Sequence, residues 1–297
     1  MIIPNEQVDT REVTTWKGLH LLHYQSSSCS QKVRILLREK ALDWTSHDVN
    51  ISRGEHISPY YLGINPRGVV PALVHDGVVH VESNDIVSYL DTLPSEAPPF
   101  VPQDPEQRRF VEESLAREAA LHLDLRNITM RFLLPPFAMR KSPATLRRYA
   151  EAGRSDPQRA AEVEWWRAFG ESGVSLAAAK ASVAAHRAVF EDFERRLEKG
   201  PWLLGDTLSV LEVSWFIRTK RLALAGYPLE DHPRLQAWHH RLAARPAFAA
   251  ETKDVLPMRL AVPAYQLYLR GRGHRLADVT KDQAGRRSTA AATDGDH

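Results

Sequence analysis

The side chains best suited to chemistry lie in the stretch HYQSSSCSQKVRILLREK, residues 23–40, where serines surround the chain's only cysteine, Cys29. A thiol is a good nucleophile only as the thiolate, and an ordinary cysteine has a pKa of about 8.5. A hydroxyl that donates to sulfur and the positive end of a helix dipole both stabilise a thiolate. The same serines could instead only cap a helix.

Both interpretations need a strand that ends, and a helix that begins, around this stretch. Residues 18–24, GLHLLHY, are apolar enough for a short strand, and after Ser30 apolar residues recur at helical spacing. With the elements that follow, this order predicts a compact α/β domain over residues 17–94. The later elements expected in it are a strand at 44–49, a hairpin of 71–75 and 78–81 that turns at Asp76-Gly77, and a helix at 83–92.

The second part of the chain is expected to be helical. Residues 93–105, LPSEAPPFVPQDP, contain five prolines and predict a linker, after which we expect an all-helical domain over residues 105–270. Residues 140–160 are polar and interrupted by prolines, which predicts a mobile surface excursion. Residues 276–297 are small and polar, so we expect a disordered tail. The expected helices cover 106–133, 174–199, 233–243 and 246–252, with another that opens at the capping-box pair Ser209 and Glu212.

The composition narrows the class of protein. A formal net charge of +2 disfavours a general nucleic-acid binder. No stretch approaches the roughly 18 consecutive apolar residues of a membrane span, and residues 1–13 lack the apolar core of a secretory signal. A single cysteine cannot form an internal disulfide, which fits a cytoplasmic location. His239 and His240 would point to different sides of a helix, so we expect no metal site.

Four stretches of the chain, in this order, are similar to stretches of one family. The chain resembles the cytosolic glutathione S-transferase superfamily, with a serine- and cysteine-containing signature similar to those of the zeta class and of bacterial dehalogenases and β-etherases. The resemblance implies the GST fold, an α/β thioredoxin-like N-terminal domain followed by an all-α C-terminal helical domain, and implies glutathione as co-substrate. The stretches are SSCSQKVRILLREK (27–40), SRGEHISPYYLGINPRGVVPAL (52–73), VESNDIVSYLD (81–91) and WLLGDTLSVLEVSWF (202–216).

The resemblance assigns catalytic roles to the first of these stretches. Ser27 lies at the position of the serine that stabilises the glutathione thiolate, with Ser28 as the second candidate. Cys29 resembles a redox nucleophile that forms a mixed disulfide with glutathione, although it could equally be a small half-buried residue without chemistry. Because the chain has no second cysteine, only glutathione could resolve that disulfide.

The resemblance also assigns residues that bind glutathione. Pro71 is expected to follow a cis bond that turns the Val70 backbone towards the cysteinyl amide, although a trans proline opening an edge strand is the alternative. Glu82 and Ser83 suit the ammonium and carboxylate of the γ-glutamyl end, or could only cap a helix. His56 is assigned to the glycyl carboxylate, and on its own would be taken as a surface histidine.

Two classes of function follow. The first is a glutathione-dependent transferase, a homodimer, whose bound thiolate attacks a small hydrophobic or aromatic electrophile held by a second-substrate pocket of the helical domain. Conjugation, isomerisation, dehalogenation and ether cleavage, in detoxification or aromatic catabolism, are all compatible with the signature. The second is a non-catalytic protein of the same fold that binds a ligand or a partner. Val69 stands where the family usually has Gln or Lys, which would weaken glutathione binding.

Overall fold

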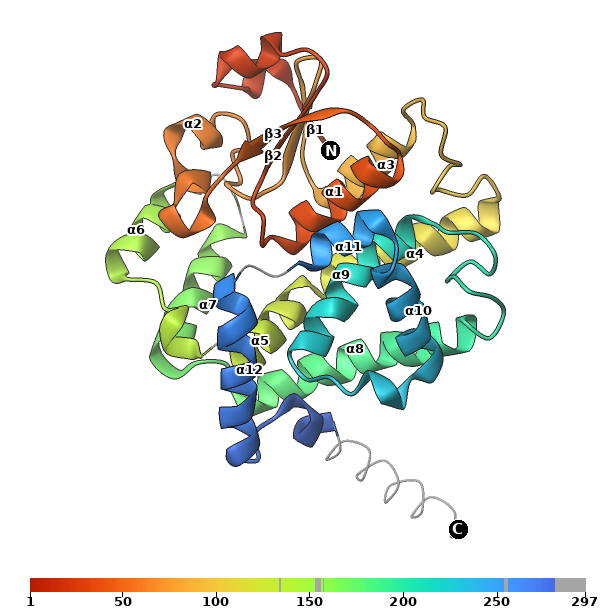
Figure 1. The fold of residues 1–297 in the computed structure, drawn as a ribbon. Helices are drawn as coiled ribbons and strands as arrows, with labels where there is room; N and C mark the ends of the chain where they lie inside the picture. The colour runs from red at the N-terminus through yellow and green to blue at the C-terminus, as the bar shows by residue number, and fades with distance from the viewer. Residues whose placement is uncertain (134, 153–155, 157, 254–255, 281–297) are drawn as a thin grey trace, which may run out of the picture. The chain divides into compact units, whose positions relative to one another are not determined.

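The computed structural model describes residues 1–297 apart from 134, 153–155, 157, 254–255 and 281–297 (Figure 1). The chain divides into two compact units, each assembled from separate stretches of sequence. The first unit comprises Met1–Val111, Lys141–Ala168 and Ser209–Ile217. The second comprises Glu112–Arg140, Phe169–Leu208 and Arg218–His297.

The first unit is built on a five-stranded sheet with the order β1-β5-β4-β2-β3. β2 pairs in parallel with β3 and antiparallel with β4, and the remaining pairs are antiparallel. A parallel pair needs a crossover connection, which α1 supplies. The strands are β1 (Ile2–Ile3), β2 (Leu19–His23), β3 (Trp44–Asp48), β4 (Ala72–His75) and β5 (Val78–His80).

Helices cover both faces of this sheet. α1 (Ser28–Glu39) packs against α3 (Ser83–Asp91) on one face, and the short α2 (Pro59–Leu62) lies on the other (Figure 1). The strands, hairpin and two long helices expected between residues 18 and 92 are therefore confirmed. The buried cluster under α2 includes Leu22, Val74, Val79, Tyr61 and Ile64.

The first sixteen residues, which the sequence analysis left outside the α/β domain, also contribute to the sheet and its core. β1 pairs with β5, so that Ile2 lies opposite His80. Val8 and Val13 are fully buried in the cluster under α2. A two-residue strand followed by two 3₁₀ turns has no periodicity long enough to predict it from sequence.

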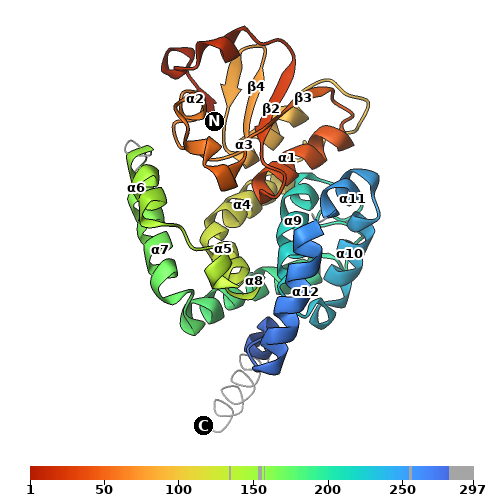
Figure 2. The same cartoon turned by 60° about the vertical axis from the view of Figure 1, so that its left-hand side comes forward.

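The remaining long elements are helical. One helix was expected over residues 106–133, but α4 and α5 are separate because Leu121 leaves the helical conformation at ψ 12°. Within the second unit, α5 packs along α8 (Figure 2). The helices are α4 (Pro105–Ala120), α5 (His122–Phe132), α6 (Pro143–Ala152), α7 (Arg159–Ser172), α8 (Leu176–Arg196), α9 (Val210–Leu224), α10 (Pro233–Ala243), α11 (Pro246–Thr252) and α12 (Leu256–Gly271).

The polar segment 140–160, expected to be a mobile surface excursion, instead contains α6 and the start of α7. Pro143 occupies the first turn of α6, where its missing N–H costs nothing, and Ser142 caps the helix by accepting from the Thr145 N–H at 3.1 Å. Tyr149 is only 6% exposed. The expectation was wrong because a proline at a helix start was interpreted as a helix breaker. Residues 153–155 and 157 of this segment lie outside the described residues.

The expected capping box at α9 is present. The carboxylate of Glu212 accepts from the backbone N–H and the hydroxyl of Ser209, at 2.8 and 2.7 Å, and both residues are fully buried. The tail expected from residue 276 starts with five helical residues in which Leu276 and Val279 are buried. Its remainder, 281–297, lies outside the described residues. None of the helices in the described part of the chain is long and apolar enough to cross a membrane.

Candidate active site

The strand register brings the segments that carry the expected site residues to one end of the sheet. Leu22, near the end of β2, lies opposite Ala72 at the start of β4, so the chain after β2 and the Val70-Pro71 turn emerge together. Leu73 of β4 pairs with His80 at the end of β5, which leads directly into α3. The N-terminal parts of α1 and α3 are joined by Lys32, whose Nζ donates to Asn84 Oδ1 at 2.6 Å.

The serine-rich stretch forms the start of α1. Ser27 is the N-cap, and its hydroxyl oxygen accepts from the Ser30 N–H at 3.3 Å. Ser28 and Cys29 are the first helical residues, and like Ser27 they are half-buried. A hydroxyl that accepts a capping bond still has its proton to donate, so capping and thiolate stabilisation are compatible at Ser27.

Arg34, which the sequence analysis did not single out, is a buried residue that connects α1 to the end of β2 and to the loop between them. Arg34 is 4% exposed, and its guanidinium donates to Nδ1 of His23 and to the carbonyls of Tyr24 and Gln25. Burial, with the positive charge of Arg34 and the neighbouring His47, lowers the pKa of His23 to about 4. A signal for Arg34 was present, since it lies four residues after Ser30 and three before Leu37, on a face that α1 buries.

The Val70–Pro71 bond is cis, which confirms the conformation expected for it. The carbonyl of the preceding residue, Val69, accepts from the Tyr61 hydroxyl at 2.7 Å and from the Asn65 amide at 2.8 Å. Asn65 is 1% exposed. These bonds to the Val69 carbonyl fix the turn before β4. Because they use only the backbone, any residue at this position could make them.

Glu82 is the N-cap of α3 and Ser83 its first residue. Glu82 has a φ of +65°, a region that residues other than glycine rarely adopt. Its carboxylate is ion-paired with the guanidinium of Arg67, and both side chains are about one-third exposed. The expected binding residue Glu82 therefore already has a cationic partner, Arg67, which the sequence analysis did not single out.

His56 lies in the 3₁₀ turn η4 (Glu55–Ile57) and is 2% exposed, not at the surface. Its Nε2 is hydrogen-bonded to the Tyr149 hydroxyl of α6. Burial, together with the positive charges of Lys141 and Arg159, lowers the pKa of His56 to about 4, so the imidazole is neutral at pH 7. Its Nδ1 is buried and has no hydrogen-bond partner among the described residues.

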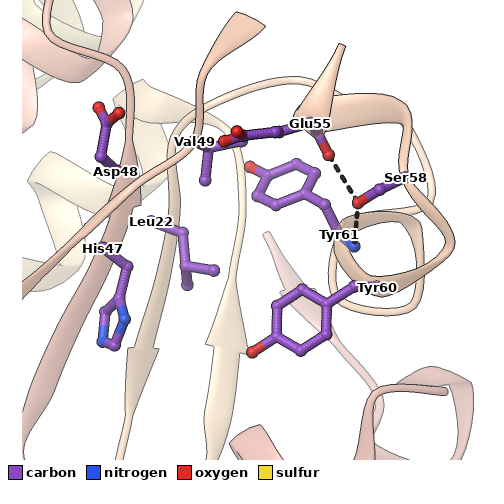
Figure 3. A pocket seen from close by; sticks show the side chains of 8 residues that line it. All are labelled: Leu22, His47, Asp48, Val49, Glu55, Ser58, Tyr60 and Tyr61. Atoms are coloured by element: carbon purple, nitrogen blue, oxygen red, sulfur yellow. Dashed lines mark hydrogen bonds between the residues drawn. The ribbon is translucent and has the colours of Figure 1, made fainter. Parts of the chain in front are cut away.

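In the part of the chain that the structure describes, no side-chain hydrogen bond joins any two of the eight expected site residues. A cavity of about 400 Å³ in the same unit lies elsewhere, between β2–β3 and the segment from η4 to α2 (Figure 3). There the Ser58 hydroxyl donates to the Glu55 carbonyl and accepts from the Tyr61 N–H, which caps α2. None of the eight residues lines this cavity.

The helical unit contains a larger cavity of about 670 Å³. Among its lining residues are Arg131, Tyr265 and Tyr268. Burial lowers the pKa of Arg131, against the opposing effect of Tyr265. The cavity therefore combines aromatic and aliphatic side chains with two basic ones, Arg131 and His274.

Comparison with known families agrees with this arrangement. The family model for the N-terminal domain of glutathione S-transferases matches residues 26–93, and the model for the C-terminal domain matches residues 171–250. The chain belongs to the glutathione S-transferase superfamily. The expected fold, an α/β domain followed by a helical domain, is thereby confirmed.

Several proteins of the superfamily are similar to parts of this chain. It is 40% identical over 90 residues to glutathione S-transferase 1 of Dianthus caryophyllus, covering 30% of this chain and 40% of that protein. It is 41% identical over 93 residues to maleylacetoacetate isomerase of Pseudomonas aeruginosa, covering 30% and 43%. The β-etherase LigF of Sphingobium sp. strain SYK-6 superposes with a TM-score of 0.65 at 25% identity, covering 78% of this chain and 98% of LigF. The chain thus spans about two-fifths of the length of the first two relatives.

Proposed function

We propose that this protein is a glutathione-dependent transferase that binds glutathione as co-substrate and activates its thiol for attack on a small hydrophobic or aromatic electrophile. The observation that carries the proposal is the convergence, at one end of the sheet, of the Ser27-capped start of α1, the cis Val70–Pro71 bond and the start of α3. Thiolate stabilisation, an exposed backbone edge and a helix N-terminus for a carboxylate are three separate requirements of a bound tripeptide thiol.

Each residue has a distinct role in this proposal. The Ser27 hydroxyl donates to the glutathione sulfur, assisted by the positive end of the α1 dipole and by Ser28 as a second donor. The backbone of Val70 pairs with the cysteinyl amide in the manner of an added strand. The backbone N–H groups at the start of α3, with the Ser83 hydroxyl, hold the γ-glutamyl carboxylate.

At the glycyl end, neutral His56 can donate through Nδ1 to the carboxylate. When Nε2 accepts from the Tyr149 hydroxyl, the proton of a neutral imidazole resides on Nδ1. A buried donor without a partner costs about 1–3 kcal/mol. A ligand carboxylate would remove that cost, which favours binding at this end.

The helical domain is proposed to bind the second substrate, in keeping with the aromatic lining of its cavity. Conjugation, isomerisation, dehalogenation and ether cleavage remain alternative reaction types for the same thiolate. A homodimer and a cytoplasmic location are part of the proposal. Analytical ultracentrifugation would test the dimer.

The decisive experiment is calorimetric titration of the full-length protein with reduced glutathione at pH 7, in two buffers of different ionisation enthalpy. A dissociation constant at or below about 1 mM, roughly −4 kcal/mol, with net proton release, would support a site that binds glutathione as the thiolate. S-methylglutathione, which has no thiol proton, should bind without that release. Absence of binding by either ligand would contradict the proposal and favour the non-catalytic alternative.

A further inference from the structure

The segment Lys141–Ala168 lies in the helical half of the sequence, yet it belongs to the α/β unit. Two buried residues connect it to the loops that carry the proposed glutathione-binding residues. Tyr149 bonds to His56, and the Arg159 guanidinium, in a side chain 2% exposed, donates to the backbone carbonyl of Arg67. The segment is therefore fixed against the loops that carry His56 and the turn before Pro71.

The same segment reaches the residue that pairs with Glu82. Arg67 lies between two carboxylates: it is ion-paired with Glu82, and its Nε lies 3.6 Å from Oδ2 of Asp156. Its Nη2 also donates to the amide oxygen of Gln158 at 3.2 Å. The Asp156 side chain is 7% exposed, whereas those of Arg67 and Glu82 are about one-third exposed.

The charges of this cluster do not balance. It contains the carboxylates of Glu82 and Asp156 and the single guanidinium of Arg67. Arg159, a buried cation of the segment, is paired with Glu162 at 3.1 Å, and its bond to Arg67 goes to the backbone carbonyl. Burial acts to lower the pKa of Arg67, but Glu82 and Asp156 outweigh it and raise the pKa. The two carboxylates therefore share one guanidinium, and a cation of a ligand would complement them.

A zwitterionic α-amino-acid end supplies that cation and a carboxylate as well. We propose that Glu82 binds the ammonium of the γ-glutamyl end of glutathione, that Arg67 binds its α-carboxylate, and that Asp156 is a positioning residue that holds Arg67 so that Glu82 is available to the ammonium. The segment Lys141–Ala168 thus contributes a positioning residue that makes this protein selective for a thiol peptide with a free α-amino-acid end. This inference rests on the proposed glutathione-dependent function.

The geometry gives Asp156 a specific role when the ammonium replaces Arg67 as the partner of Glu82. An ammonium that approaches Glu82 displaces Arg67 from it, and Asp156 is the second carboxylate that keeps the guanidinium neutralised. Without Asp156, the guanidinium would pair with Glu82 alone and compete with the ammonium. Ammonium binding is therefore weaker in Asp156→Asn, although Glu82 itself is unchanged.

The test is calorimetric affinity for glutathione and for two analogues, glutaryl-cysteinylglycine, which lacks the ammonium, and γ-aminobutyryl-cysteinylglycine, which lacks the α-carboxylate. Asp156→Asn should weaken glutathione binding roughly 5- to 10-fold and leave the glutaryl analogue within about 2-fold. Asp156→Glu should restore much of the glutathione affinity. Glu151→Gln, which removes the same charge from an exposed position of the segment, is the matched control and should bind like wild type.

Arg67→Met tests the second part of the proposal, in which Arg67 binds the α-carboxylate. It should lower the affinity for glutathione towards that for the γ-aminobutyryl analogue, since the α-carboxylate loses its guanidinium partner and keeps only the N–H groups of α3 and the Ser83 hydroxyl. Equal losses for all three ligands in Asp156→Asn would indicate only a structural role and overturn the inference. Wild-type affinity in Asp156→Asn would also overturn it while leaving the proposed function intact. If the wild-type protein binds neither glutathione nor S-methylglutathione, the proposed function and this inference both fail.

Discussion

The guanidinium of Arg34 lies against the imidazole of His23, with Nη1 2.9 Å from Nδ1, and also donates to the carbonyl of Gln25 at 2.9 Å. A residue in the second turn of α1 is therefore bonded to the end of β2 and to the loop that leads to Ser27. Since arginine only donates, Nδ1 of His23 accepts, and Nε2 carries the proton towards Ser46 Oγ at 2.8 Å. This arrangement fixes both the loop and the neutral form of His23.

Arg34→Lys should destabilise the protein and impair the site together. A lysine cannot bond to His23 and two carbonyls at once, and each buried group left without a partner costs about 1–3 kcal/mol. We expect the free energy of unfolding to fall by about 2 kcal/mol or more, and kcat/KM to fall with it because the loop before Ser27 loosens. Urea unfolding and steady-state kinetics would measure both. Arg38→Lys, at an exposed position of the same helix, should change neither.

The buried His56 predicts a loss of stability in mild acid. Its pKa is about 4 in the folded protein and near 6.5 when unfolded, so between these values the unfolded chain binds more protons. Its contribution is complete above about pH 6.5 and is lost as pH falls towards 4, by at most about 3 kcal/mol. In His56→Gln the unfolding free energy should change less steeply across that window. An unchanged slope would show that His56 does not titrate in this way, and His240→Gln, at an exposed site, serves as control.

The sequence predicts the α/β domain well because its elements have short-range signals. The strand of residues 18–24, the Asp76-Gly77 hairpin and the capping pair Ser209–Glu212 each depend on neighbouring residues. The resemblance also implied the cis bond before Pro71 correctly. Contacts over long sequence separations were not predictable, as the β1 strand shows, which pairs with β5 nearly eighty residues later.

The same distinction applies to the candidate site. The start of α1 was predicted from the spacing of apolar residues after Ser30. The Arg67–Asp156 pair and the Tyr149–His56 bond join residues about ninety positions apart, and no local pattern indicates them. Polar composition even argued against an ordered segment around Tyr149. A buried tyrosine such as Tyr149, whose hydroxyl bonds to a residue far away in the chain, looks like a surface residue in the sequence.

Ser27 and Ser28 should differ in their effect on turnover. Ser27→Ala removes the proposed donor to the thiolate and should lower kcat by about 100-fold or more, whereas Ser28→Ala should lower it much less. Because Ser27 also caps α1, its loss should cost about 1 kcal/mol of stability. Ser27→Asn keeps an acceptor for the cap without the hydroxyl, so it should be stable but slow. Equal losses of activity in Ser27→Ala and Ser28→Ala would contradict the assignment.

The capping box should matter for folding and not for glutathione binding. Ser209→Ala removes a fully buried hydroxyl that bonds the Glu212 carboxylate, and should lower the unfolding free energy by about 1–2 kcal/mol. Ser175→Ala removes an exposed cap of α8, which accepts from the Ala178 N–H at 3.1 Å, and should cost less. Thermal unfolding would rank the two variants, and calorimetry should find wild-type glutathione affinity in both. A smaller cost at Ser209 would contradict the role of burial.

Cys29 should separate two kinds of chemistry. In conjugation the nucleophile is glutathione, so Cys29→Ala should retain at least about half of the wild-type kcat. In reductive removal of glutathione from a conjugate, the Cys29 thiolate attacks the thioether sulfur and forms a mixed disulfide. The carbon leaves with the bonding electron pair and takes a proton, and a second glutathione thiolate then releases oxidised glutathione. Cys29→Ala should abolish that reaction, and Cys29→Ser should abolish it as well. Mass spectrometry of wild-type protein incubated with a conjugate, without free glutathione, should detect one added glutathionyl group. A Cys29→Ala variant that still reduces the conjugate would exclude this role for Cys29.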